Sequence, residues 1–178
     1  SLYLKGLTSY PRTSSQKLPK ELNPKKLIQD IAKNPMYKEK AEYLLNKNLT
    51  KPNEGKKEDH AHPAIFPTGI TAKITEEKEQ KIYDLIVKRF LACFGEPATR
   101  ETVTAKIEIE KEIFVSKGTT TLIKGWHKLY EPYVKLSEEE LPVLDEGTTT
   151  NIDKVNKYAK ETQPPKRYTP ASLISELE

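Results

Sequence analysis

The sequence predicts an α+β protein in which helices come first and antiparallel strands follow. Across residues 1–97 apolar side chains recur at helical spacing, with Asn, Pro and Gly at the expected helix ends. After Pro97 apolar and polar residues alternate, which is typical of strands with one buried face. With 35% hydrophobic and 31% charged residues, the chain is polar but retains enough apolar side chains to fold. We therefore expect a mainly helical region followed by a β-rich region.

The first helical signals lie on either side of an N-terminal loop. Residues 1–5 are predicted to end a helix, with Gly6 just after its C-cap. Asn23 is a favourable N-cap and Pro24 a favourable first helical residue, so the next helix is predicted to begin there. This helix is predicted to end before Pro35, because proline disfavours helical backbone in the residue that precedes it.

Two further helices are predicted in the first half of the chain. One covers residues 37–47, and the longest covers residues 75–94. Residues 48–61 between them are rich in Lys, Asn, Pro and Gly and predict a surface loop. The apolar face of the long helix is predicted to pack in the core and comprises Ile82, Leu85, Ile86, Phe90, Cys93 and Phe94. The single cysteine, on that face, is interpreted as a core thiol rather than a nucleophile.

The strands are predicted between residues 102 and 124. Residues 102–109 alternate, and one face carries Val103, Ala105, Ile107 and Ile109. Two further strands, 112–116 and 119–124, are predicted on either side of Gly118. Trp126, in the irregular segment that follows, is interpreted as a core anchor rather than a platform for base stacking.

The C-terminal part mixes loops with weaker signals. Residues 137–146 are acidic and loop-like, and residues 148–162 are predicted to form a long strand or a pair of strands. Two prolines at 164–165 indicate a linker. Thr169 and Pro170 are predicted to begin a final helix.

Charge and composition exclude some classes of protein and leave others open. The net charge of +4, from 30 basic and 26 acidic residues, is too small to establish nucleic-acid binding by itself. No apolar run is long enough to span a bilayer, and no signal-peptide pattern opens the chain, so we expect no membrane partner. One cysteine cannot form an internal disulfide, which favours a reducing, cytoplasmic location.

The loop at residues 7–20 contains an unusual combination of Tyr10, Pro11 and Arg12. Pro11 restricts its own backbone and favours an extended Tyr10, so phenol and guanidinium are presented from a stiff turn. A guanidinium can hold a phosphodiester through two parallel hydrogen bonds and favours a phenolate beside it. The residues therefore suit a tyrosine nucleophile that attacks DNA. The alternative is a surface turn with no chemistry.

Two histidines close the loop at residues 48–61. His60 and His62 have the spacing of a metal-binding pair, but no cysteine or third histidine lies nearby in sequence to complete a zinc site. We therefore reject a zinc site. A histidine can also move protons near neutral pH or donate a hydrogen bond to a phosphate. The alternative is a loop histidine bonded to backbone.

These motifs resemble those of type IA DNA topoisomerases. SYPRTSSQKLP is similar to the active-site tyrosine motif of that family, and HAHPAIFPT is similar to its second motif. KIYDLIVKRFLACFGEPA, GWHKLYEP and PPKRYTPASLISELE also resemble family segments and follow in the family's order. The resemblance therefore runs over essentially the whole chain, which looks like a part of an archaeal topoisomerase I or III.

The resemblance implies an internal fragment of a multidomain α+β enzyme. Residues 1–97 would form most of the mainly helical catalytic-tyrosine domain, and residues 98–166 the returning half of an antiparallel β-rich arch domain. Residues 167–178 would begin a helix of a further domain. A chain that opens with Ser1 and stops inside an apparent helix suits a fragment. Strands without their partners leave open edges, so a dimer or a crystal contact made by edge pairing, or a poorly ordered sheet, is expected.

The resemblance also implies a reaction and its residues. The family cuts one DNA strand by transesterification, links a tyrosine to the 5′ phosphate, passes a second strand and reseals the cut. By residue match Tyr10 is the nucleophile, Arg12 holds the scissile phosphate and His62 supports it. Ser14 stands where many relatives have an acidic residue, which leaves the tuning of Arg12 open.

The family's metal site is not recognisable in this chain. Family members bind Mg²⁺ through carboxylates of a Toprim domain, which does not appear here, so the fragment alone is expected to be inactive. The expected partners are DNA, preferentially single-stranded, and the rest of the parent polypeptide. Two alternatives stay open: the topoisomerase half of a reverse gyrase, and a non-catalytic module that binds single-stranded DNA.

Overall fold

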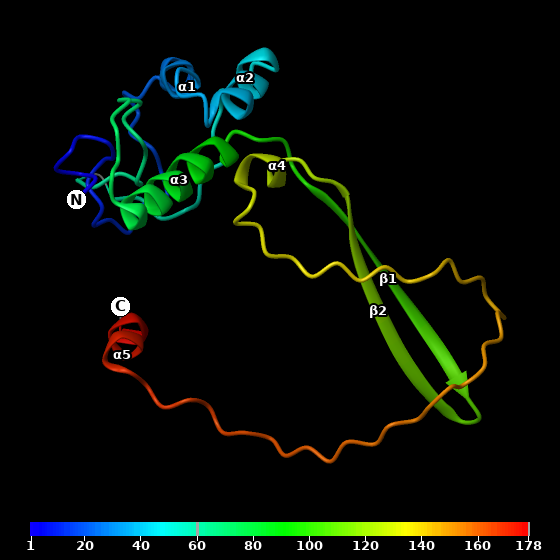
Figure 1. Cartoon of the computed structure of the whole chain (residues 1–178). Coiled ribbons are helices and arrows are strands. Elements are labelled where there is room, and N and C mark those ends of the chain that lie inside the picture. Colours follow the sequence, from blue (N-terminus) through cyan, green and yellow to red (C-terminus); the bar gives the residue numbers. More distant parts are fainter. Residues whose placement is uncertain (60, 178) are drawn as a thin grey trace. The chain divides into compact units, whose positions relative to one another are not determined.

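The structure is a computed structural model that describes residues 1–59 and 61–177. It divides into two units, Ser1–Pro142 and Val143–Glu178 (Figure 1). The first unit contains helices α1 (Pro24–Ala32), α2 (Lys38–Asn46), α3 (Glu77–Ala92) and α4 (His127–Tyr130), with strands β1 (Thr99–Ile109) and β2 (Glu112–Ile123). The second contains α5 (Pro170–Leu177). The predicted α+β class is confirmed, whereas the domain boundaries after residues 97 and 166 stay predictions.

The N-terminal residues form a helical turn that ends at Gly6. The amide of Lys5 donates to the carbonyl of Ser1 at 3.2 Å, and Gly6 then adopts a left-handed φ of 68°. The amide of Leu7 reaches back to the carbonyl of Leu2 at 3.0 Å, which completes a glycine-terminated helix end. The predicted role of Gly6 is therefore confirmed, and the turn directs the chain into the loop that follows.

The first two helices agree with the sequence prediction. Asn23 Oδ1 accepts from the amide of Lys26 at 3.0 Å, and Pro24 is the first residue of α1. The helix packs against α2, and both bury apolar side chains, among them Ile28 and Leu44, each with 0% of its surface exposed. Of the described residues in the loop predicted at 48–61, none lies in a helix or strand.

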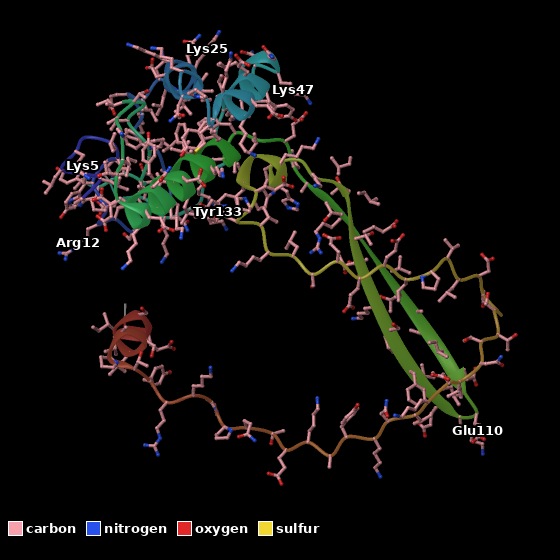
Figure 2. The ribbon with its side chains drawn as sticks, in the orientation of Figure 1. Lys5, Arg12, Lys25, Lys47, Glu110 and Tyr133 are labelled. Atoms are coloured by element: carbon pink, nitrogen blue, oxygen red, sulfur yellow. The ribbon has the colours of Figure 1, made fainter. Side chains whose placement is uncertain are left out.

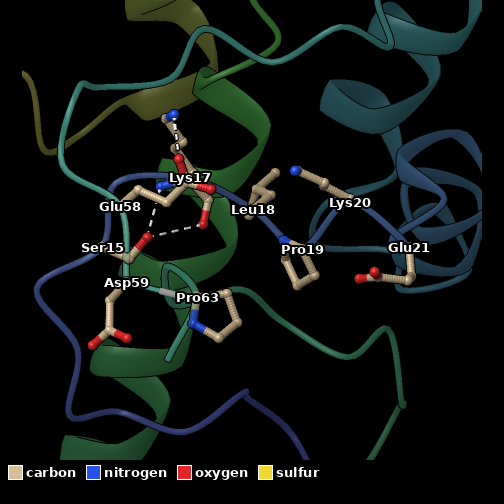
Figure 3. Close-up of a pocket in the computed structure, with 9 residues that line it drawn as sticks. All are labelled: Ser15, Lys17, Leu18, Pro19, Lys20, Glu21, Glu58, Asp59 and Pro63. Atoms are coloured by element: carbon tan, nitrogen blue, oxygen red, sulfur yellow. Dashed lines mark hydrogen bonds and ion pairs between the residues drawn. The ribbon is translucent and has the colours of Figure 1, made fainter. Parts of the chain in front are cut away.

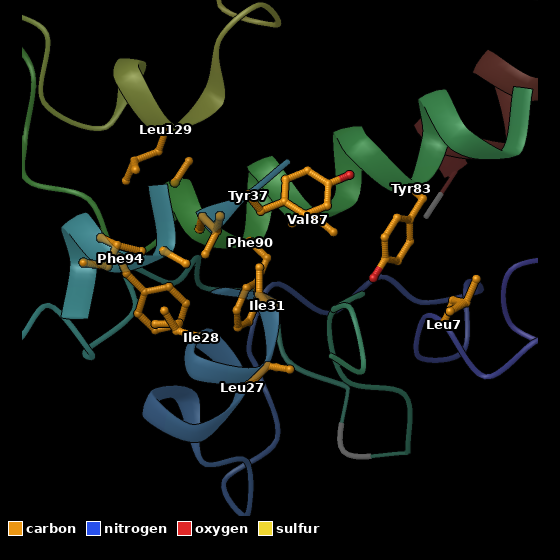
Figure 4. Close-up of a cluster of buried hydrophobic side chains, with 14 of the residues drawn as sticks. Leu7, Leu27, Ile28, Ile31, Tyr37, Tyr83, Val87, Phe90, Phe94 and Leu129 are labelled. Carbon is orange, nitrogen blue, oxygen red and sulfur yellow. The ribbon is translucent and has the colours of Figure 1, made fainter. Parts of the chain in front are cut away.

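The longest helix, α3, lies at the centre of the core, but the predicted face was partly wrong. Phe90 and Phe94 are buried as predicted, whereas Ile82 and Leu85 are 52% and 36% exposed. The buried face instead comprises Tyr83, Val87, Phe90, Leu91 and Phe94 (Figure 4). Apolar residues occupy most of the helix circumference, so periodicity alone does not choose between adjacent faces. α3 also packs against α4, which contributes the buried Leu129 to the same core.

The two strands form one long antiparallel hairpin (Figure 1). The two strands predicted around Gly118 are a single strand, because Gly118 pairs with Val103 without interruption. A β-carbon on Gly118 would lie 2.5 Å from the carbonyl oxygen of Glu139, so glycine allows the segment beside β2 to approach. The predicted buried face is only half buried, and Val103 is 43% exposed, because the described sheet has two strands and no covering layer.

The second unit has little regular structure. The strand predicted at 148–162 is wrong: these residues are exposed and form no ladder, and a strand needs a partner to satisfy its backbone. The final helix is confirmed, because Thr169 Oγ1 accepts from the amide of Ser172 at 3.1 Å and Ser172 Oγ accepts from the amide of Thr169 at 2.8 Å. Among the residues described, no helix combines the length and the apolar character needed to cross a membrane.

Candidate active site

The tyrosine loop is anchored to a segment more than fifty residues away in the sequence. Thr8 forms an isolated antiparallel bridge with Pro67. The amide of Ser9 donates to the carbonyl of Phe66 at 2.9 Å, and Ser9 Oγ accepts from the amide of Phe66 at 3.0 Å. Thr8 is 5% exposed, so these contacts lie against the core. They fix the residue just before Tyr10.

The far end of the same loop is also held by backbone hydrogen bonds. The carbonyl of Lys17 accepts from the amide of Ala64, and the amide of Gln16 donates to the carbonyl of Lys57, both at 2.8 Å. Between the two anchors, the Thr13 hydroxyl donates to the carbonyl of His62 and accepts from the amide of Ser15 at 2.9 Å. Hydrogen bonds therefore hold the loop to residues 57–67, the segment that contains His62, at both of its ends and in its middle.

Tyr10 projects from this loop between two other rings. Its ring centroid lies 5.5 Å from that of His62, with the planes tilted by 36°, and 5.3 Å from that of Tyr3 in an edge arrangement. Tyr10 is 41% exposed, so the phenol remains accessible to a large ligand. The structure thus brings together Tyr10 and His62, which the sequence predicted as partners.

Arg12 lies two residues after Tyr10, and no contact in the described residues holds its side chain. Its side chain is exposed and extends outward from the loop (Figure 2). Within residues 1–59 and 61–177, no hydrogen bond or ion pair engages its guanidinium, and Ser14 is likewise exposed without a side-chain partner. A free guanidinium two residues from a tyrosine is suited to receive an anion.

Three groups of His62 have partners: its backbone amide, its backbone carbonyl and its ring nitrogen Nδ1. Its amide donates to Asp59 Oδ1 at 3.2 Å, and its carbonyl accepts from Thr13. Its Nδ1 lies 3.4 Å from Asp59 Oδ2. The amide of Ala61 also donates to Asp59, at 2.9 Å, and this bond is the main cause that holds the pKa of Asp59 below its ordinary value. His60, the other histidine considered for a metal pair, lies outside the described residues.

Comparison with known proteins identifies the family of this chain. A family model described as DNA topoisomerase matches residues 1–178. The chain belongs to the type IA DNA topoisomerase family. It is 47% identical to DNA topoisomerase 1 of Pyrococcus horikoshii, across 100% of this chain and 26% of that protein. It is 50% identical to DNA topoisomerase 1 of Methanocaldococcus jannaschii, across 99% of this chain and 23% of that protein.

A human relative extends the comparison beyond archaea. DNA topoisomerase 3-alpha of Homo sapiens is 36% identical across 99% of this chain and 18% of its own length. The chain therefore spans about a quarter or less of the length of these topoisomerases. The predicted membership of the topoisomerase family is thus confirmed.

A pocket of about 370 Å³ adjoins the tyrosine loop of this topoisomerase chain (Figure 3). Ser15, Lys17 and Lys20 line one side, and Glu58 and Asp59 contribute carboxylates. Lys17 Nζ lies 2.7 Å from Glu58 Oε2, and this hydrogen bond raises the pKa of Lys17. Lys17 is therefore already engaged, whereas Lys20 is exposed at the pocket rim.

Metal binding finds no support in the described part of this topoisomerase chain. No group of three or more His, Cys, Asp or Glu side chains there is placed to hold a metal ion. Sequence reasoning missed two members of the site, Asp59 and Tyr3. Asp59 could have been suspected because it lies three residues before His62, the spacing of a side chain that caps a turn. Nothing in the sequence marks Tyr3.

Proposed function

We propose that this chain is the tyrosine-bearing segment of a type IA DNA topoisomerase that cleaves one DNA strand, passes another through the break and reseals it. The observation that supports this most is the placement of Tyr10 beside His62 and next to the unpaired Arg12, in a chain of this family. The partner we propose is DNA, preferentially single-stranded, in a cytoplasmic enzyme.

The proposed reaction is a transesterification. The Tyr10 oxygen forms a bond to phosphorus while the bond from phosphorus to the 3′ oxygen breaks. The phenol loses its proton and the 3′ oxygen gains one, so one ester replaces another. Resealing is the reverse exchange. Because a phosphoester is conserved throughout, strand cleavage and closure need no external energy source.

The other two residues stabilise charge in this proposal. Arg12 would hold the scissile phosphate through paired hydrogen bonds, which place the phosphorus and offset charge on its oxygens in the transition state. His62 would donate a hydrogen bond to the same phosphate or move the proton of the exchange. Ser14, two residues after Arg12, is exposed and carries no charge.

Magnesium has no site in the described residues of this chain, and no step above passes through a metal. We propose that Mg²⁺ in the intact enzyme is bound by a Toprim domain elsewhere in the polypeptide. Phosphoryl transfer needs more charge stabilisation than one guanidinium and one imidazole provide. The isolated chain is therefore expected not to cleave or relax DNA.

The test is covalent trapping in the full-length protein that contains this segment. Single-stranded oligonucleotide labelled at either end is incubated with wild-type protein and with Tyr10→Phe, and the protein is then denatured. A 5′-phosphotyrosine retains the downstream piece, so the 3′ label stays with the protein and the 5′ label is released. Tyr10→Phe is expected to bind DNA but trap neither label. Retention of the 5′ label, or undiminished trapping by Tyr10→Phe, would contradict the proposal; a module that only binds DNA would trap nothing in either form.

A further inference from the structure

Asp59 uses its two carboxylate oxygens in different ways. Oδ1 accepts from the amides of Ala61 and His62, at 2.9 and 3.2 Å, and closes a turn of the kind that Asp and Asn side chains commonly form. Oδ2 is left for the imidazole, and lies 3.4 Å from His62 Nδ1. A single side chain therefore shapes the backbone at His62 and contacts its ring.

The remaining nitrogen of the ring is the one available to a ligand. Nδ1 faces Asp59, and the ring lies against Tyr10 with centroids 5.5 Å apart. Within the described residues, Nε2 of His62 has no hydrogen-bond partner. The histidine therefore has one nitrogen facing a carboxylate and the other without a partner among the described residues, in a ring that lies against Tyr10.

We propose that Asp59 is a positioning residue that acts through His62, an inference that rests on the function proposed above. By accepting Nδ1–H, the carboxylate selects the tautomer in which Nε2 takes the proton of the exchange, and it stabilises the resulting imidazolium, which can donate from Nε2 to the phosphate. The low pKa of Asp59, caused first by the Ala61 amide, keeps this carboxylate ionised near neutral pH.

The competing explanation is that Asp59 only shapes the loop, and two substitutions separate the roles. Asp59→Asn retains an oxygen that can accept from the amides of Ala61 and His62, so the turn survives, but it removes the charge that faces Nδ1. Asp59→Ala removes both functions. Asp153→Asn provides the matched control, because Asp153 is exposed and has no side-chain partner in the described structure.

The experiment measures single-turnover cleavage of an end-labelled oligonucleotide by the full-length protein that contains this segment. Asp59→Asn is expected to slow cleavage about tenfold, the low end of the loss found when the partner that orients a metal-binding histidine is removed. Oligonucleotide affinity and thermal stability should stay within about twofold and a few degrees of wild type. In a His62→Ala background, the same Asp59→Asn change should alter the rate less than twofold, because the group it acts through is gone. His62→Gln serves as the background if His62→Ala does not fold.

Three results would overturn the inference. One is a wild-type cleavage rate in Asp59→Asn with a loss confined to Asp59→Ala, which assigns Asp59 to the turn alone. Another is an equal loss from Asp59→Asn with and without His62. The third is a comparable loss in Asp153→Asn. If Tyr10→Phe still traps DNA, the proposed function itself is wrong; if Tyr10→Phe is inactive and Asp59→Asn is normal, only the positioning role is lost.

Discussion

Arg12 allows the sharpest test of the site, because its chemistry can be removed without touching the fold. Its side chain is exposed and makes no hydrogen bond or ion pair within the described residues. Substitutions of such surface residues usually change stability by less than about 0.5 kcal/mol. Arg12→Ala should therefore melt within a degree or two of wild type.

The loss of function follows from the hydrogen bonds that Arg12 is proposed to make. Hydrogen bonds to charged groups contribute about 1.5–3 kcal/mol each, and the exposure of Arg12 favours the low end of that range. Two such bonds to the phosphate then correspond to about 3 kcal/mol, or roughly 100-fold in the rate of cleavage. Arg12→Lys retains a point charge without the paired geometry and should lose roughly tenfold. Both variants retain Tyr10, so slow covalent attachment should persist.

The assay is the rate of 3′-label attachment to full-length protein at limiting oligonucleotide, where losses in binding and in transition-state stabilisation both count, with a melting curve for each variant. Lys20→Ala is the matched control, because Lys20 is a cation on the same loop, exposed and farther from Tyr10 in sequence. A rate for Arg12→Lys equal to wild type would refute the paired-bond reasoning. A drop of many degrees in the melting temperature of Arg12→Ala would show that Arg12 has a structural role.

Three further predictions concern the fold. Leu91 has 0% of its surface exposed, so Leu91→Ala should lower the free energy of unfolding by about 3 kcal/mol in denaturant titrations. Ile82 is 52% exposed, so Ile82→Ala should lower it by less than about 1 kcal/mol. Equal losses in the two variants would contradict the observed buried face of α3. Burial, then the hydrogen bond to Asp84, raises the pKa of Tyr133 to about 12, so the folded state holds its phenolic proton after the unfolded chain begins to lose it near pH 10. The free energy of unfolding should therefore fall between about pH 10 and 12. If the free energy of unfolding of Tyr133→Phe falls equally steeply with pH, this phenol is not the cause. The isolated chain should self-associate through hairpin edges as concentration rises, and Val103→Lys should weaken this; sedimentation that shows a monomer at every concentration would contradict it.

Local rules explain the parts of the fold that the sequence predicted well. The cap at Asn23, the left-handed Gly6 and the final helix after Thr169 each depend on a few neighbouring residues, so the pattern contains the needed information. The strand expected at 148–162 failed because alternation does not supply a pairing partner. The prediction of the buried face of α3 was partly wrong because residues beside the observed face, such as Ile82, are also apolar.

The candidate site also contains residues that the sequence predicted and residues that it did not. Tyr10, Arg12 and His62 were assigned by their resemblance to topoisomerase motifs, whereas the residues alone left open a surface turn and a loop histidine bonded to backbone. Asp59 was missed because its contact depends on how a loop folds back on itself, which periodicity does not report. The roles of all four residues stay proposals until the kinetic tests above.

The way the loop is held explains why its chemistry can be separated from its stability. The contacts that fix it are made by backbone groups and by residues against the core, including Thr8 at 5% and Ser15 at 9% exposure. The side chains proposed to act on DNA, among them Tyr10 at 41%, are exposed. Substituting an exposed side chain leaves the anchoring bonds to Phe66 and Lys57 intact, so loss of cleavage in such a variant is expected to report on chemistry. A substitution at Thr8 should instead move the whole loop, and should lower cleavage and melting temperature together.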